Sequence, residues 1–393
     1  MDRPADYSSE SSPATAAPAR GLTVLGLETS CDETAAAVVH LTPDGSATVL
    51  SSVVHSQIDD HAAFGGVVPE IAARSHVEMI DGVTRRAMAE AGLDYDQLDG
   101  VAATAGPGLV GGVMVGLSFA KAVALARDLP LMAVNHLEGH AVSARLGARV
   151  DYPFLLLLAS GGHCQLLEVR GIGDMTRLGT TIDDAAGEAF DKIAKALGLG
   201  YPGGPALEAL AEHGDGTRFD LPRARLGHKD CDFSFSGLKT AASRLAHTCE
   251  TDQDRADLAD GVQTAIARQL NERSDRAMRA YAEERQPALK QPRPADEATG
   301  KQRLFVVAGG VAANRTLRST LQATAAKNGF AFLAPPMAYC TDNAAMIALA
   351  GAERLQKGWT SDIDAVARPR WPLDEKSALA DPAHRPGRKG AKA

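Results

Sequence analysis

Two histidines four residues apart carry the most specific chemistry in the chain. Residues 134–140 read VNHLEGH, so His136 and His140 lie one helical turn apart with Glu138 between them. Positions i and i+4 share one face of a helix, and two imidazoles on that face can bind one metal ion. The spacing alone leaves two interpretations open, a pair of metal ligands and two ordinary surface histidines.

The order of residues in this segment argues against a zinc protease. Such enzymes use HExxH, in which the general-base acid directly follows the first histidine. Here Glu138 comes one place later, about 200° around a helix from His136, and Gly139 weakens a helix by roughly 1 kcal/mol relative to alanine. A metal site also needs a third ligand, commonly a carboxylate. Asp342 is a candidate, although by itself it is interpreted as the N-cap of the helix that follows.

Glycine turns follow short apolar stretches at three places in the chain. Without a Cβ atom, such a turn lets backbone amides approach a ligand and bind phosphate oxygens. Three such turns favour a nucleotide cleft, but none matches the GxxxxGK[ST] loop or the GxGxxG dinucleotide motif. The turns are Ser160-Gly161-Gly162, Tyr201-Pro202-Gly203-Gly204 and Gly309-Gly310, with Asn314 after the last.

Acidic residues gather in two further stretches. Glu28, Asp32 and Glu33 surround the first polar turn, and IDDAAGEAFDK carries Asp183, Asp184, Glu188 and Asp191 at helical spacing. A solvated helix face is one interpretation of the second group, and a site for a ribose hydroxyl or a metal is the other.

The elements that must position these residues form a repeated pattern. LTVLGLETS and AAAVVHL predict a β-hairpin with a polar turn, and YPFLLLLASGGHCQLLEV repeats this plan. RLFVVAGGVAANRTLRSTL adds a strand, a glycine turn and a helix, and long amphipathic or apolar stretches at 111–128 and 260–285 predict helices. We therefore expect an α/β fold with two lobes, each starting from a hairpin whose turn faces a cleft.

The expected organisation is as follows. Residues 1–20, rich in Ser, Ala and Pro, predict a disordered tail. An N-terminal lobe covers 21–130, and a C-terminal lobe covers 131–357 with a polar, proline-rich insertion loop at 286–302. A C-terminal tail at 358–393, partly packed on the N-terminal lobe, ends in a solvated basic segment.

Composition excludes several classes of protein. The net charge of −8 argues against a surface that binds nucleic acid throughout, although Arg223, Arg225 and Lys229 offer a local basic patch or an ordinary exposed loop. The five cysteines contain no CxxC pair, which favours a reducing, cytoplasmic environment over a disulfide framework. We expect no signal peptide and no membrane span.

Taken together, many segments resemble the bacterial tRNA N6-adenosine threonylcarbamoyltransferase family, once labelled O-sialoglycoprotein endopeptidase. The resemblance covers about residues 22–355, without the first 20 residues and the 286–302 insertion. The segments are LGLETSCDETAAAVV, GGVVPEIAARSH, GPGLVGGVMVG, VNHLEGH, LLASGGH, GEAFDK, YPGGP, FSFSGLKTA, GGVAANRTLR and YCTDNAAMIA.

The resemblance implies both a fold and a reaction. The fold is the actin-like, Hsp70-type ATPase architecture, two ribonuclease-H-like lobes around a nucleotide cleft. The reaction moves a threonylcarbamoyl group from threonylcarbamoyl-adenylate to N6 of the adenosine 3′ of the anticodon in tRNAs that read ANN codons, and AMP leaves. A metalloprotease, an actin-like ATPase or sugar kinase, and a non-catalytic scaffold are the alternatives.

The resemblance also implies roles for single residues. One divalent metal ion, Fe²⁺ or alternatively Zn²⁺, is bound by His136, His140 and Asp342, and Asp32 and Glu33 match a catalytic turn near the reacting group. Glu208 stands where some relatives have aspartate, which puts its contact in question. The implied substrate contacts are Leu158, Ala159, Ser160, Gly161, Gly162, Asp191, Gly204, Glu208 and Asn314.

The implied partners are tRNA, a paralogous inactive actin-like subunit and a small P-loop ATPase, with no membrane. The apolar, small-residue helix at 111–124 is a candidate interface for the paralogous subunit, and a plain core helix is the alternative.

Overall fold

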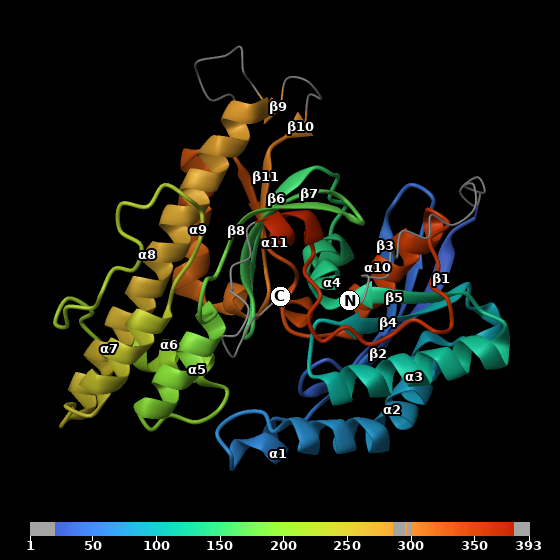
Figure 1. Cartoon of the computed structure of the whole chain (residues 1–393), viewed down its shortest axis with the longest axis horizontal. Coiled ribbons are helices and arrows are strands. Elements are labelled where there is room, and N and C mark those ends of the chain that lie inside the picture. The colour runs from blue at the N-terminus through green and yellow to red at the C-terminus, as the bar shows by residue number, and fades with distance from the viewer. Residues whose placement is uncertain (1–19, 286–294, 297–300, 381–393) are drawn as a thin grey trace, which may run out of the picture.

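A computed structural model describes residues 20–285, 295–296 and 301–380. The first of its two large sheets has the strand order β3-β2-β1-β4-β5 (Figure 1). β1 pairs antiparallel with β2 and parallel with β4, which makes the sheet mixed. The strands are β1 (Leu22–Glu28), β2 (Glu33–Leu41), β3 (Ala47–Ser56), β4 (Gly100–Gly106) and β5 (Leu131–Asn135).

The second sheet repeats this plan with the order β12-β11-β6-β7-β8. β6, β7 and β8 pair antiparallel in sequence, and β11 lies parallel to both β6 and β12. The expected repeat of one hairpin-based unit is therefore confirmed. The strands are β6 (Phe154–Ala159), β7 (Cys164–Gly171), β8 (Asp174–Thr180), β11 (Leu304–Ala308) and β12 (Ala331–Leu333), with a separate antiparallel pair β9 (Ala295–Asp296) and β10 (Lys301–Gln302).

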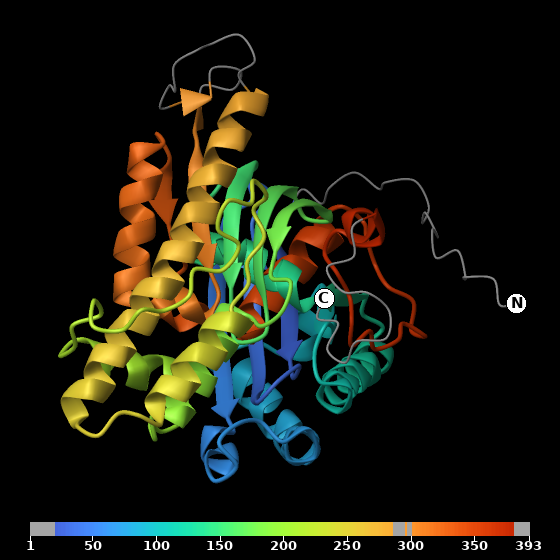
Figure 2. The same ribbon diagram turned by 60° about the vertical axis from the view of Figure 1, so that its left-hand side comes forward.

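Helices cover the outer faces of both sheets (Figures 1 and 2). The first sheet carries α1 (Ile58–Ala62), α2 (Pro69–Ala91) and α3 (Val110–Arg127). The second lobe carries α5 (Ala186–Ala196), α6 (Gly203–Ala211), α7 (Ser236–Ala246), α8 (Asp252–Arg285) and α9 (Arg315–Lys327). The remaining helices are α4 (His136–Val142), α10 (Ala344–Gln356) and α11 (Glu375–Ala380).

Two buried helices, α10 and α4, fill the space between the lobes. Every residue of α10 from Ala344 to Glu353 is buried, which suits a sequence that is apolar on all sides. It lies so close to β1 that a Cβ on Gly26 would be 2.4 Å from the Ala344 carbonyl oxygen. α4 packs Leu137 on the inner face of the second sheet. The histidines of α4 are therefore held where the two sheets meet.

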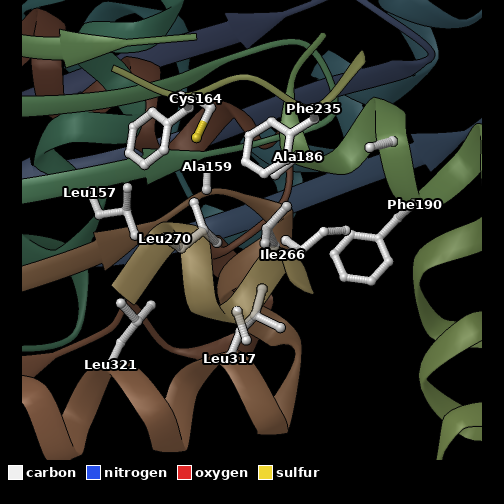
Figure 3. Packing of buried hydrophobic residues seen from close by; sticks show 14 of the residues in the cluster. Leu157, Ala159, Cys164, Ala186, Phe190, Phe235, Ile266, Leu270, Leu317 and Leu321 are labelled. Carbon is white, nitrogen blue, oxygen red and sulfur yellow. The ribbon is translucent and has the colours of Figure 1, made fainter. Parts of the chain in front are cut away.

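The second lobe has its main core on the opposite face of its sheet. Figure 3 shows strand residues such as Leu157 and Ala159 packed against Ile266 and Leu270 of α8 and Leu317 of α9. This core fixes the carboxyl ends of β6 and β11, where the glycine turns begin.

The sheets divide the chain later than the lobe boundary that we expected at residue 131. β5 begins at that residue but belongs to the first sheet, and α10 also packs on the first sheet. The boundary between the two sheets therefore lies between Asn135 and Phe154. The chain then returns to the first lobe at α10. The expected tail at 1–20 falls, except for Arg20, outside the described residues, as do most of the 286–302 insertion and residues 381–393.

The segment after α10 crosses the first lobe close to the histidines. Arg368 N donates to Ala105 O, and the Asn135 side chain donates to Trp371 O over 2.9 Å. Because Asn135 caps α4, this crossing helps to hold the helix that bears both histidines.

α3 is long and apolar enough to cross a membrane by length and composition, although we expected no such stretch. In this fold Val113, Leu117 and Ala120 are buried in the core of the first lobe. Length and composition alone are weak evidence for a span, since core helices pass the same test.

Candidate active site

The histidine pair lies on a buried helix. α4 begins directly after β5, and the Asn135 side chain caps it by accepting a hydrogen bond from Leu137 N over 2.9 Å. His136 is 5% exposed and His140 is 0% exposed. The interpretation as two surface histidines is therefore wrong.

Asp342 completes a three-residue cluster with these histidines. Asp342 Oδ1 lies 3.0 Å from His140 Nε2 and 3.6 Å from His136 Nε2. Asn343, and not Asp342, caps α10, because its side chain accepts from Met346 N over 3.0 Å. The N-cap interpretation of Asp342 is therefore wrong, and its carboxylate is free to face the histidines.

The cluster has the donor set of a metal site. One ligand atom from each of His136, His140 and Asp342 lies within 4.8 Å of the other two. The histidine rings meet edge to face, with centroids 4.7 Å apart. Among the described residues, His140 Nδ1 has no hydrogen-bond partner, so that ring is bonded only on its Asp342 side. Two imidazoles and one carboxylate suit Fe²⁺ and Zn²⁺.

The charges around the cluster favour a cation. Burial raises the pKa of Asp342, but His136 and His140 lower it more and hold it well below its usual range. Burial lowers the pKa of His136, but Asp342 and Glu28 raise it to about 9. Two carboxylates thus favour a positive charge at this position, which a bound metal ion can supply while the imidazole stays neutral.

Glu138 has a different role from the histidines beside it. It is 2% exposed, and its carboxylate accepts from Gly173 N over 2.7 Å and from Arg354 Nε over 2.7 Å. These contacts tie α4 to the β7–β8 turn and to α10. Both oxygens of Glu138 are therefore committed to structural contacts, and Glu138 does not serve as a protease-type base.

The β1–β2 turn brings two acids toward the cluster. Asp32 is 6% exposed, and Tyr201 from the second lobe donates a hydrogen bond to its Oδ2 over 3.3 Å. Burial, followed by the charges of Asp342 and Asp32, raises the pKa of Glu33 well above its ordinary value. The sequence pattern identifies Tyr201 only as the first residue of the second glycine turn and predicts no contact for its side chain.

The β6–β7 turn faces open space. A Cβ atom on Gly161 or Gly162 would meet no atom within 4 Å, so packing does not require glycine at either position. Gly309 differs, because its φ is +93° and its Cβ would lie 2.4 Å from the Ala159 carbonyl oxygen. The third glycine turn is thereby packed directly against the first. Leu158 and Ala159 are fully buried strand residues that can reach a ligand only through their backbone.

The remaining expected substrate residues lie on helices around this turn. Asp191 Oδ1 accepts from Gly203 N over 2.9 Å, next to Gly204. Glu208 accepts from Arg315 N over 2.8 Å. Asn314 caps α9 and donates to Gln263 Oε1 over 2.8 Å. The Glu208 and Asn314 side chains thus already have protein partners.

The other acids of the IDDAAGEAFDK segment have structural partners. Asp183 accepts from the hydroxyls of Ser234 and Ser236 and from the Phe235 amide, which ties the FSFSG segment to the start of α5. Lys192 pairs with Glu188 on one helix face. Asp191 differs in that its carboxylate accepts a hydrogen bond from a glycine turn.

The arginines of the expected basic patch already have partners within the protein. Arg225 pairs with Asp230 over 2.5 Å, and the buried Arg273 donates to the Arg225 carbonyl oxygen over 2.7 Å. Arg223 lies 3.7 Å from Glu272. A cavity of about 590 Å³ opens beside this loop and is lined in part by Arg223, but by none of the residues expected to bind metal or substrate. This region is therefore separate from the histidine cluster.

Two repeated lobes with a ligand cluster at their junction define an α/β protein of the actin-like ATPase class. HypF of T. kodakarensis has this fold, with a TM-score of 0.55, 15% identity and coverage of 90% of this chain and 50% of that chain. The expected fold class is confirmed.

Sequence comparison assigns the family. The model of the tRNA N6-adenosine threonylcarbamoyltransferase family matches residues 48–349. A protein of that name from Caulobacter vibrioides is 69% identical over 372 residues, 95% of this chain and 98% of the relative. The relative from Maricaulis maris is 56% identical, over 96% of this chain and 98% of its own length. The chain belongs to the tRNA N6-adenosine threonylcarbamoyltransferase family.

Proposed function

We propose that the chain transfers a threonylcarbamoyl group from threonylcarbamoyl-adenylate to N6 of the adenosine 3′ of the anticodon in tRNAs that read ANN codons, with release of AMP. Family membership makes the chain an enzyme of tRNA modification. The observation that carries the proposal is the His136, His140 and Asp342 cluster beside a glycine turn that faces open space.

The chemistry needs positioning more than a covalent nucleophile. The carbamoyl-adenylate is a mixed anhydride, which is already activated, and AMP is a good leaving group. A site that holds the donor carbonyl against the adenosine amine therefore supplies much of the rate. The amides of Gly161 and Gly162 are proposed to bind the AMP moiety, since no side chain blocks approach to the two glycines. The Ser160 amide already donates to the His163 carbonyl oxygen over 2.8 Å and holds the turn closed.

The proposed metal is one Fe²⁺ ion, with Zn²⁺ as the alternative. His136, His140 and Asp342 fit such an ion by donor type, convergence and charge. When bound, a divalent ion of this kind supplies Lewis-acid polarisation of a carbonyl oxygen. The chain itself keeps the three ligands oriented and excludes water, because α4 is buried along its whole length.

Asp32 is the proposed proton acceptor for the adenosine amine. Adenine N6 is a poor nucleophile, so a nearby base aids loss of its proton. Glu33 is less suited to this role, because its raised pKa keeps it protonated to higher pH. Asp32 lies at the lobe junction, where Tyr201 of the opposite lobe donates a hydrogen bond to it.

The proposed partners follow from the family resemblance and from one helix face. tRNA is the acceptor substrate, and a paralogous actin-like subunit and a small P-loop ATPase are the proposed protein partners in the cytoplasm. On α3, Val110, Met114 and Leu125 are 53%, 54% and 68% exposed. Apolar side chains on one exposed helix face suit a protein interface.

The two rival activities lack a residue in the required place. A zinc protease of the HExxH type takes its base from the helix that bears the histidines, and the acid of this helix, Glu138, is committed to Gly173 and Arg354. A sugar kinase or ATPase of this fold uses carboxylates to bind Mg²⁺, whereas His136 and His140 suit a softer ion.

The test is the double variant His136→Ala with His140→Ala. We expect the purified variant to lose its metal, measured by elemental analysis, and to form no threonylcarbamoyladenosine, measured by mass spectrometry of tRNA nucleosides. A control that replaces the exposed His213 and His247 by alanine keeps both properties. Full modification by the metal-free variant overturns the proposed mechanism.

A further inference from the structure

We propose that Glu28 is the positioning residue for His136, holding the Nδ1 proton so that Nε2 faces His140 and Asp342 as a ligand atom. This inference rests on the proposed metal centre. It adds a carboxylate that is not itself one of the three ligands and that comes from a different strand of the first lobe.

Glu28 is built into the site by three hydrogen bonds. It is the last residue of β1 and is 1% exposed. His136 Nδ1 lies 2.9 Å from Glu28 Oε2, and the Thr104 hydroxyl donates to the same oxygen over 2.6 Å. Ser30 N donates to Oε1 over 2.5 Å. β1, β4 and the β1–β2 turn therefore fix the carboxylate before any ligand binds.

This arrangement determines which nitrogen of His136 is available. A neutral imidazole carries one proton, and a carboxylate acceptor at Nδ1 keeps the proton there. The lone pair then lies on Nε2, the atom 3.6 Å from Asp342 Oδ1. Carboxylates that accept from a metal-bound histidine fix its tautomer and orientation, and their loss typically costs about 10–100-fold in metal affinity.

The two histidines differ in this respect. Among the residues that the structure describes, His140 Nδ1 has no hydrogen-bond partner, whereas His136 Nδ1 lies next to Glu28 and 3.2 Å from Ser30 Oγ. Glu28 Oε2 contacts the side of the His136 ring opposite to Nε2. Glu28 therefore acts through His136 and is not a fourth ligand.

The test compares Glu28→Gln and Glu28→Ala with the wild-type protein. A glutamine has one oxygen and one NH₂, so it cannot accept from Ser30 N on one side and from His136 and Thr104 on the other. We expect the Zn²⁺ dissociation constant, measured by chelator competition, to rise about 10–100-fold in Glu28→Ala and less in Glu28→Gln. In the Zn²⁺-loaded protein, the slowly exchanging Nδ1 proton resonance of His136 is expected to disappear in Glu28→Ala.

Two further variants separate positioning from folding. Thr104→Val removes a donor to Glu28 without touching His136, and a smaller rise in the dissociation constant is expected. Glu138→Gln alters a similarly buried carboxylate on α4 itself, whose hydrogen bonds within the described part of the chain go to Gly173 and Arg354 and not to a histidine. We expect it to lower the melting temperature while leaving the Zn²⁺ affinity and the Nδ1 resonance unchanged.

The outcomes distinguish this inference from the proposed function. If Glu28→Ala is folded and keeps both wild-type Zn²⁺ affinity and the Nδ1 resonance, while Asp342→Ala loses Zn²⁺, the positioning role is wrong and the metal centre stands. If the wild-type protein binds neither Zn²⁺ nor Fe²⁺, the metal centre itself is wrong. Equal losses in Glu28→Ala and Glu138→Gln indicate a general effect of buried carboxylates and also overturn the inference.

Discussion

The β1–β2 turn and the β6–β7 turn occupy the same place in two sheets of the same topology, yet they differ in composition. The first turn lies between Glu28 and Glu33 and carries hydroxyls, a thiol and acids. The second consists of Ser160, Gly161, Gly162 and His163, in which the two glycines face open space. One backbone plan thus presents side chains in the first lobe and bare amides in the second.

This difference shows how a repeated fold can make an asymmetric site. Acids on the first turn lie in the lobe that holds the proposed metal ligands, where Asp342 and His136 shift each other's pKa in opposite directions. Exposed amides on the second turn suit an anion such as a phosphate. The proposed donor, threonylcarbamoyl-adenylate, has both a carbonyl and a phosphate, so its two parts can bind to different lobes.

The largest effect on the rate of tRNA modification is expected from a substitution in the β1–β2 turn. Asp32→Asn removes the proposed base while its amide oxygen can still accept from Tyr201. We expect the single-turnover rate of tRNA modification to fall about 10²–10⁴-fold, the range for loss of a general base. Rates are measured by nucleoside mass spectrometry at saturating tRNA and adenylate.

Metal content is the control for this variant, because His136, His140 and Asp342 are untouched and should still bind the ion. Glu33→Gln is expected to cost less than Asp32→Asn, since Glu33 is already held toward its protonated form. A rate for Asp32→Asn within twofold of the wild type would assign the proton transfer to another group.

A smaller effect is expected at the β6–β7 turn, where a substitution should change the affinity for AMP and not the stability of the fold. In Gly161→Ala the new Cβ meets no protein atom, so stability should not change. The methyl group occupies space proposed for the AMP moiety. We therefore expect the dissociation constant of the AMP complex to rise about tenfold, equivalent to ~1.4 kcal/mol of binding free energy. Calorimetric titration with AMP and a thermal melt measure the two quantities.

Gly187→Ala provides the matched comparison for this turn. Its Cβ would lie 2.6 Å from the Ser160 carbonyl oxygen, so the substitution should destabilise the fold by about 1–3 kcal/mol. If Gly161→Ala instead loses stability and retains AMP affinity, the open turn is a structural feature and the contrast between the two turns fails.

Much of this site could be predicted from the sequence because its parts are local. The hairpins, the glycine turns and the i, i+4 histidines each depend on a short stretch, and the family resemblance ordered them. Asp342 joined the histidines as expected from the resemblance, although it lies 202 residues from His140. Its own local pattern suggested only a helix cap, a role that the next residue, Asn343, performs.

The contacts that the sequence did not reveal are those between distant segments. Glu28 contacts His136 because β1 and β5 both lie next to β4 in the sheet. The spacing of residues along the sequence does not predict this contact. Tyr201 reaches Asp32 only because the two lobes lie side by side. The lobe boundary at residue 131 placed β5 in the second lobe. β5 belongs to the first sheet because it pairs with β4, and this pairing cannot be read from its own sequence.

The smallest effect concerns Asp191, the acid beside the second glycine turn. Burial raises its pKa, and the Gly203 and Gly204 amides only partly oppose this shift. A folded-state pKa above the unfolded value means that the folded protein binds the proton more tightly, so stability falls as pH rises through that interval. Asp191→Asn should therefore gain stability relative to the wild type as pH rises above about 4, by no more than about 1 kcal/mol.

Asp215→Asn should show the opposite pH dependence. Hydrogen bonds from Thr217 lower the pKa of Asp215, so its contribution to stability is present above about pH 4 and is lost as pH falls through the folded-state pKa. Denaturant titrations of both variants from pH 3 to 8 measure the two slopes. A shared sign would show that Asp191 stabilises the fold like an ordinary surface acid. Opposite signs would mean that the Asp191 carboxylate destabilises the fold, as expected for a residue whose role is to bind a ligand.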